Sequence, residues 1–181
     1  MPSEGGVATR LTDEFADAQE PSWSPDGKRV AFQSYRDGNY HIWSVSKNGS
    51  DLKQHTSGMW DDREPFFSPD GNSIVFSSDR SGNYDIWKLD ISTGALSQLT
   101  SNPANESNPA YSHDGTKIAF ISDRKEGAGV YVLENGAEQL FHGTKGRLTA
   151  PSFNKDDSAV FFTEFTGKSM LFDDKNSSVL F

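Results

Sequence analysis

The sequence predicts an all-β protein, a β-propeller of about four four-stranded blades, and three observations indicate this fold. First, one segment recurs along the chain at intervals of 44, 44 and 42 residues, a period typical of repeat architectures. Second, each copy contains four short stretches that read as strands, separated by turn residues. Third, the same types of side chain recur at equivalent positions of each copy, which is not expected of a β-sandwich. The marker prolines are Pro21, Pro65, Pro109 and Pro151, and one set of equivalent aromatics is Phe32, Phe76, Phe120 and Phe162.

The second copy shows how each strand is predicted. Pro65–Ser68 is the first strand, and the turn Ser68-Pro69-Asp70-Gly71 ends it, with proline, aspartate and glycine at positions that suit them. The apolar run within Ser73–Ser78 suits a second strand that is covered on both faces. Tyr84–Asp90 is the third strand and the more polar Ala95–Thr100 the fourth. Four strands in a period of about 40–45 residues are typical of a propeller blade.

The organisation that follows is a single domain over residues 1–181. Its blades span about 20–56, 64–100, 108–141 and 150–181, and an additional outer strand at 7–12 precedes them. The last copy is degraded, and Val179–Phe181 is its expected outer strand. Because five outer strands face four inner triplets, three interpretations stay open: a slice of a larger ring, a tight four-bladed ring with a frayed end, or half of a ring that a second copy completes.

Composition narrows the class of partner. The formal net charge of −9 argues against nucleic acid, whose phosphates require a basic surface, and leaves room for a basic protein or a cation. The absence of cysteine excludes a disulfide frame and a thiolate metal site. No apolar run approaches the roughly 18 residues of a membrane span, and the first residues do not read as a signal peptide.

The repeat resembles a known family. The pattern P-x-[WFY]-S-P-D-G-x-x-[IV]-[AV]-F-x-S-[DY]-R followed by Y-x-I-W is similar to the propeller repeat of the TolB-like family, over nearly the whole chain. The resemblance implies a non-catalytic, periplasmic scaffold of the Tol–Pal system that binds a protein partner, a Pal-like lipoprotein or another basic segment. Similar repeats occur in propeller domains of prolyl oligopeptidase and tricorn-type peptidases and in amidohydrolase fusions. The alternative is therefore a substrate-gating propeller of a larger hydrolase, a serine peptidase or an amidohydrolase.

Candidate binding residues lie in the loops that join the blades, which share one face of a propeller with the loops between second and third strands. These loops carry an acidic excess, which predicts either a funnel for a cation or a basic segment, or simply solvated loops. Glu20 and Glu64 immediately precede the innermost strands, so they are expected at the mouth of the central channel. Trp60 has no counterpart in other copies, and either binds a partner or caps a blade interface. The predicted partner-binding residues are Glu20, Trp60, Asp61, Asp62 and Glu64.

Other recurrent groups are expected to be structural. The pairs Asp79-Arg80 and Asp123-Arg124 recur in register with Tyr35-Arg36, which indicates an ion pair or hydrogen bonds to the loop of a neighbouring blade. The histidines show no metal-binding spacing, and no G-x-S-x-G motif occurs. We therefore expect no enzyme activity and no cofactor, apart from a calcium ion in the channel as a weaker alternative. A homodimer is a further possibility, since an uncovered blade face would otherwise be exposed.

Overall fold

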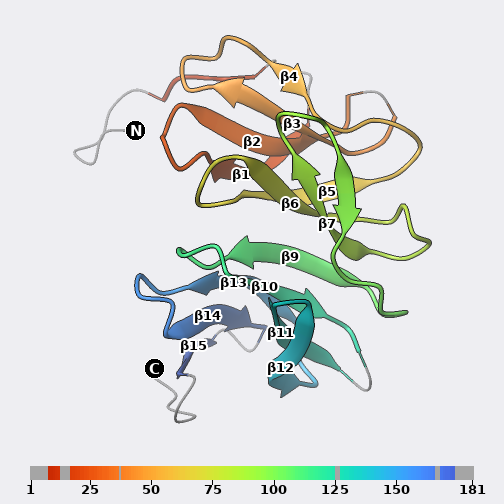
Figure 1. The fold of residues 1–181 in the computed structure, drawn as a ribbon, viewed down its shortest axis with the longest axis vertical. Coiled ribbons are helices and arrows are strands. Elements are labelled where there is room, and N and C mark those ends of the chain that lie inside the picture. Colours follow the sequence, from red (N-terminus) through yellow and green to blue (C-terminus); the bar gives the residue numbers. More distant parts are fainter. Residues whose placement is uncertain (1–7, 13–16, 37, 125–126, 166–167, 174–181) are drawn as a thin grey trace.

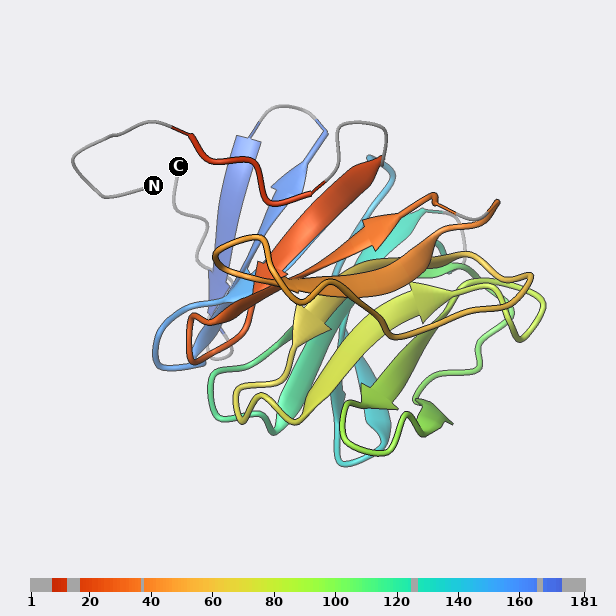
Figure 2. The same cartoon turned by 90° about the horizontal axis from the view of Figure 1, so that it is seen from above.

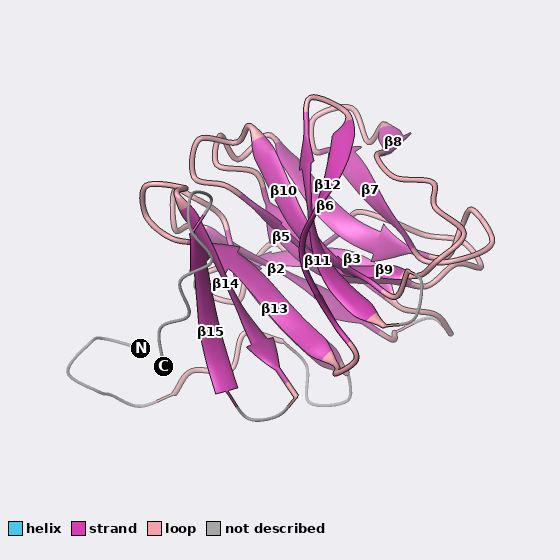
Figure 3. Cartoon of the chain, turned by 90° about the horizontal axis from the view of Figure 1, so that it is seen from below, coloured by secondary structure: helices cyan, strands magenta, loops and turns pink. Residues whose placement is uncertain are grey.

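The structure, a computed structural model, describes residues 8–12, 17–36, 38–124, 127–165 and, for the backbone, 168–173. All regular elements of this part of the chain are β-strands, as Figure 3 shows. This part of the chain contains no helix with the length and apolar character that crossing a membrane requires. The predicted all-β class is confirmed.

The strands form four antiparallel sheets, one for each repeat, and each sheet is one blade. In the first three blades the chain order is also the spatial order. The first blade contains β1 (Ala18–Trp23), β2 (Arg29–Ser34), β3 (His41–Ser46) and β4 (Lys53–Gln54). The second contains β5 (Asp62–Phe67), β6 (Ser73–Ser78), β7 (Asp85–Asp90) and β8 (Leu96–Gln98). The third contains β9 (Glu106–Tyr111), β10 (Lys117–Ser122), β11 (Ala128–Glu134) and β12 (Ala137–Thr144). The described part of the fourth contains β13 (Leu148–Phe153), β14 (Ala159–Glu164) and β15 (Lys168–Asp173).

The turn between the first two strands of a blade follows from its sequence. In the second blade the Ser68 hydroxyl donates to Asp70 Oδ1 at 2.5 Å and accepts from Ser73 N–H at 3.0 Å. Gly71 adopts φ of 73°, a conformation that glycine reaches without a steric penalty. The Ser-Pro-Asp-Gly motif therefore closes the hairpin by its own side chains, as predicted.

The first strand of each blade begins earlier than the sequence predicts, and this corrects the placement of two acidic residues. β5 starts at Asp62, so Asp62 and Glu64 lie in the strand rather than in the loop before it. Glu64 has a positive φ of 56°, and the pairing of β5 with β6 shifts register between Arg63 and Phe66. A residue in the left-handed conformation precedes each marker proline. These residues are Glu20, Glu64, Asn108 and Ala150, with φ of 50°, 56°, 52° and 52°. This left-handed residue forms a β-bulge, which interrupts the alternation of side chains between the two faces of the strand. The sequence pattern therefore predicts only the part of the strand that follows the bulge.

The outer strands differ from their predicted bounds. β8 is shorter than the expected Ala95–Thr100, because this polar strand lies at the exposed edge of the blade. The described part of the expected outer strand 7–12 is not a strand; its Leu11 instead packs on a core cluster of the first blade. Val179–Phe181 lies outside the described residues.

The core lies between the blades. One cluster joins the first two blades, a second joins the middle two and a third joins the last two. Ile74, Val75 and Phe76 are fully buried because both faces of β6 are covered. The equivalent phenylalanines Phe32, Phe76, Phe120 and Phe162 are all buried, with exposed fractions of 3%, 0%, 0% and 3%. Their expected equivalence is confirmed.

The blades form an open arc, visible as the progression from orange to blue in Figure 2. Figure 1 shows the first two blades in one half of the molecule and the last two in the other. No core cluster of the described residues joins the first blade to the fourth. Trp23 of β1 is 56% exposed. Its equivalent Phe67 of β5 is 6% exposed, because it packs against Ala31 and Ile42 of the first blade. The arrangement is therefore an arc of a propeller and not a tight four-bladed ring.

Candidate functional site

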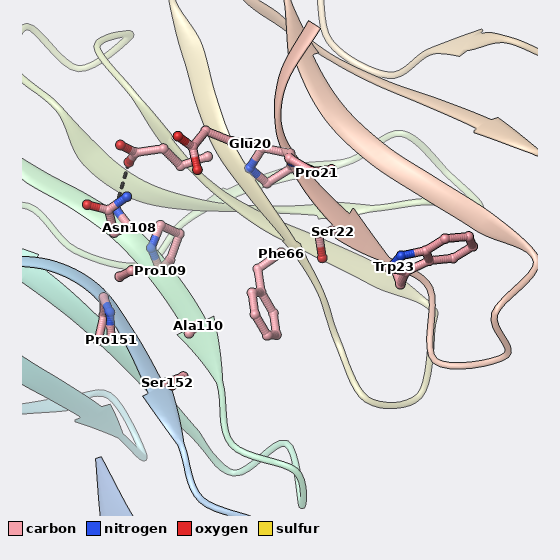
Figure 4. A pocket seen from close by; sticks show the side chains of 13 residues that line it. Glu20, Pro21, Ser22, Trp23, Phe66, Asn108, Pro109, Ala110, Pro151 and Ser152 are labelled. Atoms are coloured by element: carbon pink, nitrogen blue, oxygen red, sulfur yellow. Dashed lines mark hydrogen bonds between the residues drawn. The ribbon is translucent and has the colours of Figure 1, made fainter. Parts of the chain in front are cut away.

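The innermost strands of all four blades line one cavity of about 460 Å³ along the axis of the arc. Each strand contributes three successive residues, which form three levels of the wall, and the first strand also contributes Trp23. The first level contains the left-handed residues Glu20, Glu64, Asn108 and Ala150. The second contains the marker prolines Pro21, Pro65, Pro109 and Pro151. The third contains Ser22, Phe66, Ala110 and Ser152. This cavity is the central channel, and Figure 4 shows its wall.

Glu64 is fixed at the channel by contacts to both neighbouring blades. Its Oε2 accepts the backbone N–H of Asn108 at 2.6 Å, a hydrogen bond drawn in Figure 4. Its own N–H donates to Oε1 of Gln33 at 2.7 Å. Burial raises the pKa of Glu64 above its usual range, and the negative charge of Glu20 adds to this effect. The two carboxylates expected at the channel mouth are thus brought together, Glu20 exposed and Glu64 half-buried.

Asp61 and Trp60 lie in the loop between the first two blades, on the face where the expected loops meet. Asp61 Oδ1 accepts the backbone N–H of Tyr40 at 2.9 Å, and Oδ2 accepts Nη2 of Arg63 at 2.7 Å. Partial burial raises the pKa of Asp61, but these hydrogen bonds outweigh it and hold the pKa below its usual value. Asp61 is therefore an ionised rim residue that is already partly neutralised by Arg63.

Aromatic side chains surround this rim. The guanidinium of Arg63 lies 4.6 Å from the ring centre of Tyr40 and 5.7 Å from that of Tyr84. Trp60 is 37% exposed, and a Cβ at Gly58 would lie 3.2 Å from its ring, so the indole rests on the glycine backbone. Exposed tryptophan, tyrosine and arginine are the residue types enriched at protein–protein interfaces. The sequence pattern had not singled out Arg63, Tyr40 and Tyr84, although Tyr40 and Tyr84 recur in register.

Asp62 has a different environment from the other four predicted residues. It is fully buried, and its Oδ1 accepts Nη2 of Arg80 at 2.5 Å. His41 of the first blade lies 3.7 Å from its Oδ2. Asp62 therefore does not belong to the exposed acidic rim, because its strand begins one residue after Asp61 and turns it into the blade.

The recurrent Asp-Arg pairs explain this burial. Arg80 binds Asp62, and in the third blade Arg124 forms the equivalent ion pair with the buried Glu106. Asp79 Oδ1 accepts the backbone N–H of Asp61 at 2.9 Å. The pairs are structural, as expected, but the expected partner in a neighbouring blade's loop is wrong. Arg80 and Arg124 bind the first strands of their own blades, because β5 and β9 begin early enough to bring Asp62 and Glu106 beside them.

The carboxylates that could bind the expected calcium ion do not form one cluster. Glu20 and Glu64 line the channel, Asp61 binds Arg63 and Asp62 binds Arg80. Within the described ranges, no group of three acidic, cysteine or histidine side chains is placed to hold a metal ion. The calcium ion stays a prediction.

Four equivalent blades whose innermost strands line one channel define the protein as a β-propeller. The chain belongs to the TolB beta propeller domain family, whose sequence profile matches residues 57–179. This family assignment agrees with the resemblance of the repeat motif.

Individual proteins give the same result over different lengths. The Tol-Pal system protein TolB of Syntrophus aciditrophicus (strain SB) is 57% identical over 37 residues, 20% of this chain and 8% of that protein. The structure of putative TolB from Agrobacterium tumefaciens superposes with a TM-score of 0.82 at 22% identity, over 92% of this chain and 65% of that one. Puromycin hydrolase superposes with a TM-score of 0.74 at 16% identity, over 94% of this chain and 29% of that one. The chain therefore spans less than two thirds of each of these proteins, and the two structural likenesses show the fold.

Proposed function

We propose that this chain is a non-catalytic, protein-binding propeller, a TolB-like scaffold component that works in the periplasm. Its partner is a Pal-like lipoprotein or another protein with a basic segment, which docks on the loop face around the channel mouth. The observation that carries the proposal is the pairing of Glu20 with Glu64 at the first level of the channel. The TolB family and the Tol-Pal name of the Syntrophus relative support the choice of partner.

The electrostatics of the mouth favour a cation. Burial and the charge of Glu20 raise the pKa of Glu64, so a positive charge placed between the two carboxylates would relieve their repulsion. Asp61 adds a further negative charge at the rim, beside the aromatic contacts of Trp60. We assign the cation to the channel and the apolar contacts to the rim. Asp62 contributes by holding β5 in place through Arg80.

The test is a calorimetric titration with the soluble domain of a Pal-type lipoprotein, at about 50 and 300 mM salt. Glu20→Lys should weaken binding at least about tenfold and flatten its salt dependence, because a rim charge acts through long-range attraction. The matched control is Glu134→Lys, an exposed residue that precedes the turn at the opposite face of the third blade. Equal affinities for the two variants would reject the channel mouth as the binding site.

A second candidate function is the substrate-gating propeller of a larger hydrolase. The likeness to puromycin hydrolase, of which the chain matches 29%, favours it. A coding sequence that continues into a G-x-S-x-G domain or a metal-binding barrel would support this function. A second copy of the chain is the other partner that we propose to test, by native mass.

A further inference from the structure

A second cavity, of about 340 Å³, continues the channel toward the Ser-Pro-Asp-Gly turns. We name it the aromatic cavity, and its main lining residues are Trp23, Phe66, Pro69, Tyr111, His113 and Phe153. Trp23, Phe66 and Ser152 line both cavities, so the two spaces are continuous. Among the residues that the structure describes, no carboxylate lines the aromatic cavity, whereas Glu20 and Glu64 line the other end. The described channel is therefore acidic at one end and apolar at the other.

Phe66 marks the change between the two ends. Its counterparts at the third level are Ser22, Ala110 and Ser152, all of which are small. Phe66 is half-buried, and Figure 4 shows its ring projecting into the space between the strands that carry Ser22 and Ala110. One part of the ring packs on the core cluster between the second and third blades, but the other three blades pack without an aromatic ring at this position. The ring provides an apolar contact inside the channel.

We propose that the channel binds an extended peptide segment with a basic residue and, three or four residues away, an aliphatic or aromatic side chain. The inference rests on the proposed function and extends it to the partner's sequence. The basic group lies between Glu20 and Glu64, and the apolar side chain packs on Phe66 in the aromatic cavity. The spacing follows from the second blade, whose contribution to the aromatic cavity runs from Phe66 to Pro69, two to five residues after Glu64. The middle of this stretch is three or four residues from Glu64, or about 10–13 Å along an extended chain.

The charges and the lining together favour this occupant. A wholly basic segment would leave the aromatic cavity without an apolar partner, and a wholly apolar one would leave the half-buried Glu64 facing Glu20 without a cation. Aromatic and proline surfaces accept aliphatic and aromatic side chains of extended peptides. The His113 ring is already bound to Asp157, with Nδ1 2.9 Å from Oδ1, so it leaves the apolar character of the cavity intact.

The test measures fluorescence anisotropy of three labelled peptides with the intact chain: Lys-Ser-Ser-Ser-Leu, Lys-Ser-Ser-Ser-Ser and Gln-Ser-Ser-Ser-Leu. The first should bind about tenfold more tightly than the second, through burial of the leucine side chain. Phe66→Ser, which gives the second blade the residue type of Ser22 and Ser152, should remove this ratio and leave the affinity of Lys-Ser-Ser-Ser-Ser unchanged. Glu64→Gln should weaken both lysine peptides and preserve the ratio.

A ratio near one in the wild type, a ratio that survives Phe66→Ser, or no binding of any peptide would overturn the inference. If circular dichroism shows that Phe66→Ser does not fold, Ser22→Phe replaces it. That variant adds a second phenyl ring at the same level and should remove the leucine gain by filling the space. If leucine adds nothing while the lipoprotein still binds through Glu20, the inference fails and the proposed function stands. If Glu20→Lys has no effect on the lipoprotein, the proposed function fails.

Discussion

Neutralising Asp62 tests whether this residue stabilises the blade, as the structure indicates, or contacts a partner. Asp62 is fully buried and Arg80 is 12% exposed, with 2.5 Å between Oδ1 and Nη2. Arg80 cannot turn away to solvent easily, because its Nε donates to Ser78 at 2.9 Å and its guanidinium lies 5.2 Å from the Trp87 ring. Asp62→Asn therefore leaves a buried, uncompensated positive charge.

Removing one partner of a buried ion pair costs about 3–5 kcal/mol, and the retained amide oxygen favours the lower end. A loss of about 3 kcal/mol lowers the unfolding midpoint of a chain of this size by roughly 6–12 °C. Thermal and urea unfolding at pH 7 measure it. Glu20→Gln is the control, because it makes the same change of charge at an exposed position in a first strand and should stay within about 0.5 kcal/mol. A midpoint for Asp62→Asn within about 2 °C of that control would show that the Asp62–Arg80 ion pair does not stabilise the blade.

Two further predictions concern buried side chains. Phe67→Ala should destabilise the chain by about 3–5 kcal/mol and the equivalent Trp23→Ala by less than about 1, because only the first ring is buried between blades; equal losses in urea unfolding would contradict the open arc. Burial raises the pKa of the Asp85 carboxyl, so the folded chain binds the carboxyl proton more tightly than the unfolded chain does. The stability that this proton contributes is complete below about pH 4, the pKa of an unfolded aspartate. It is lost as the pH rises through the pKa of the folded state. Asp85→Asn should therefore gain stability relative to the wild type between pH 4 and pH 7, and a pH-independent difference would refute this assignment.

The fold could be predicted because the information repeats. The proline and the apolar second strand occur in four copies and the Asp-Gly turn in three, so the same local structure is specified several times. The equivalent phenylalanines occupy equivalent buried positions. Strand bounds were less predictable. A left-handed residue before each proline shifts the register, so Asp62 and Glu64 read as loop residues although β5 contains both.

The candidate site could be predicted in part. Glu20 and Glu64 lie at the channel as expected, because each directly precedes the marker proline of an innermost strand, although both residues are within that strand. Asp61 and Asp62 are adjacent in sequence and look alike, yet one is at the rim and the other inside the blade. The alternation of side chains along a strand decides this, and it becomes readable only once the start of β5 is known. Phe66 could not be predicted from the repeat, because its counterparts in the other copies are small residues and only shared residue types are recognised as a pattern.

The most direct measurement for the central claim is an amide chemical-shift map of the chain titrated with the soluble domain of a Pal-type lipoprotein. The largest shifts are expected at Glu20, Glu64 and Asn108, which surround the channel mouth. The largest shifts at the opposite turns, around Asp26 and Asp70, would contradict it.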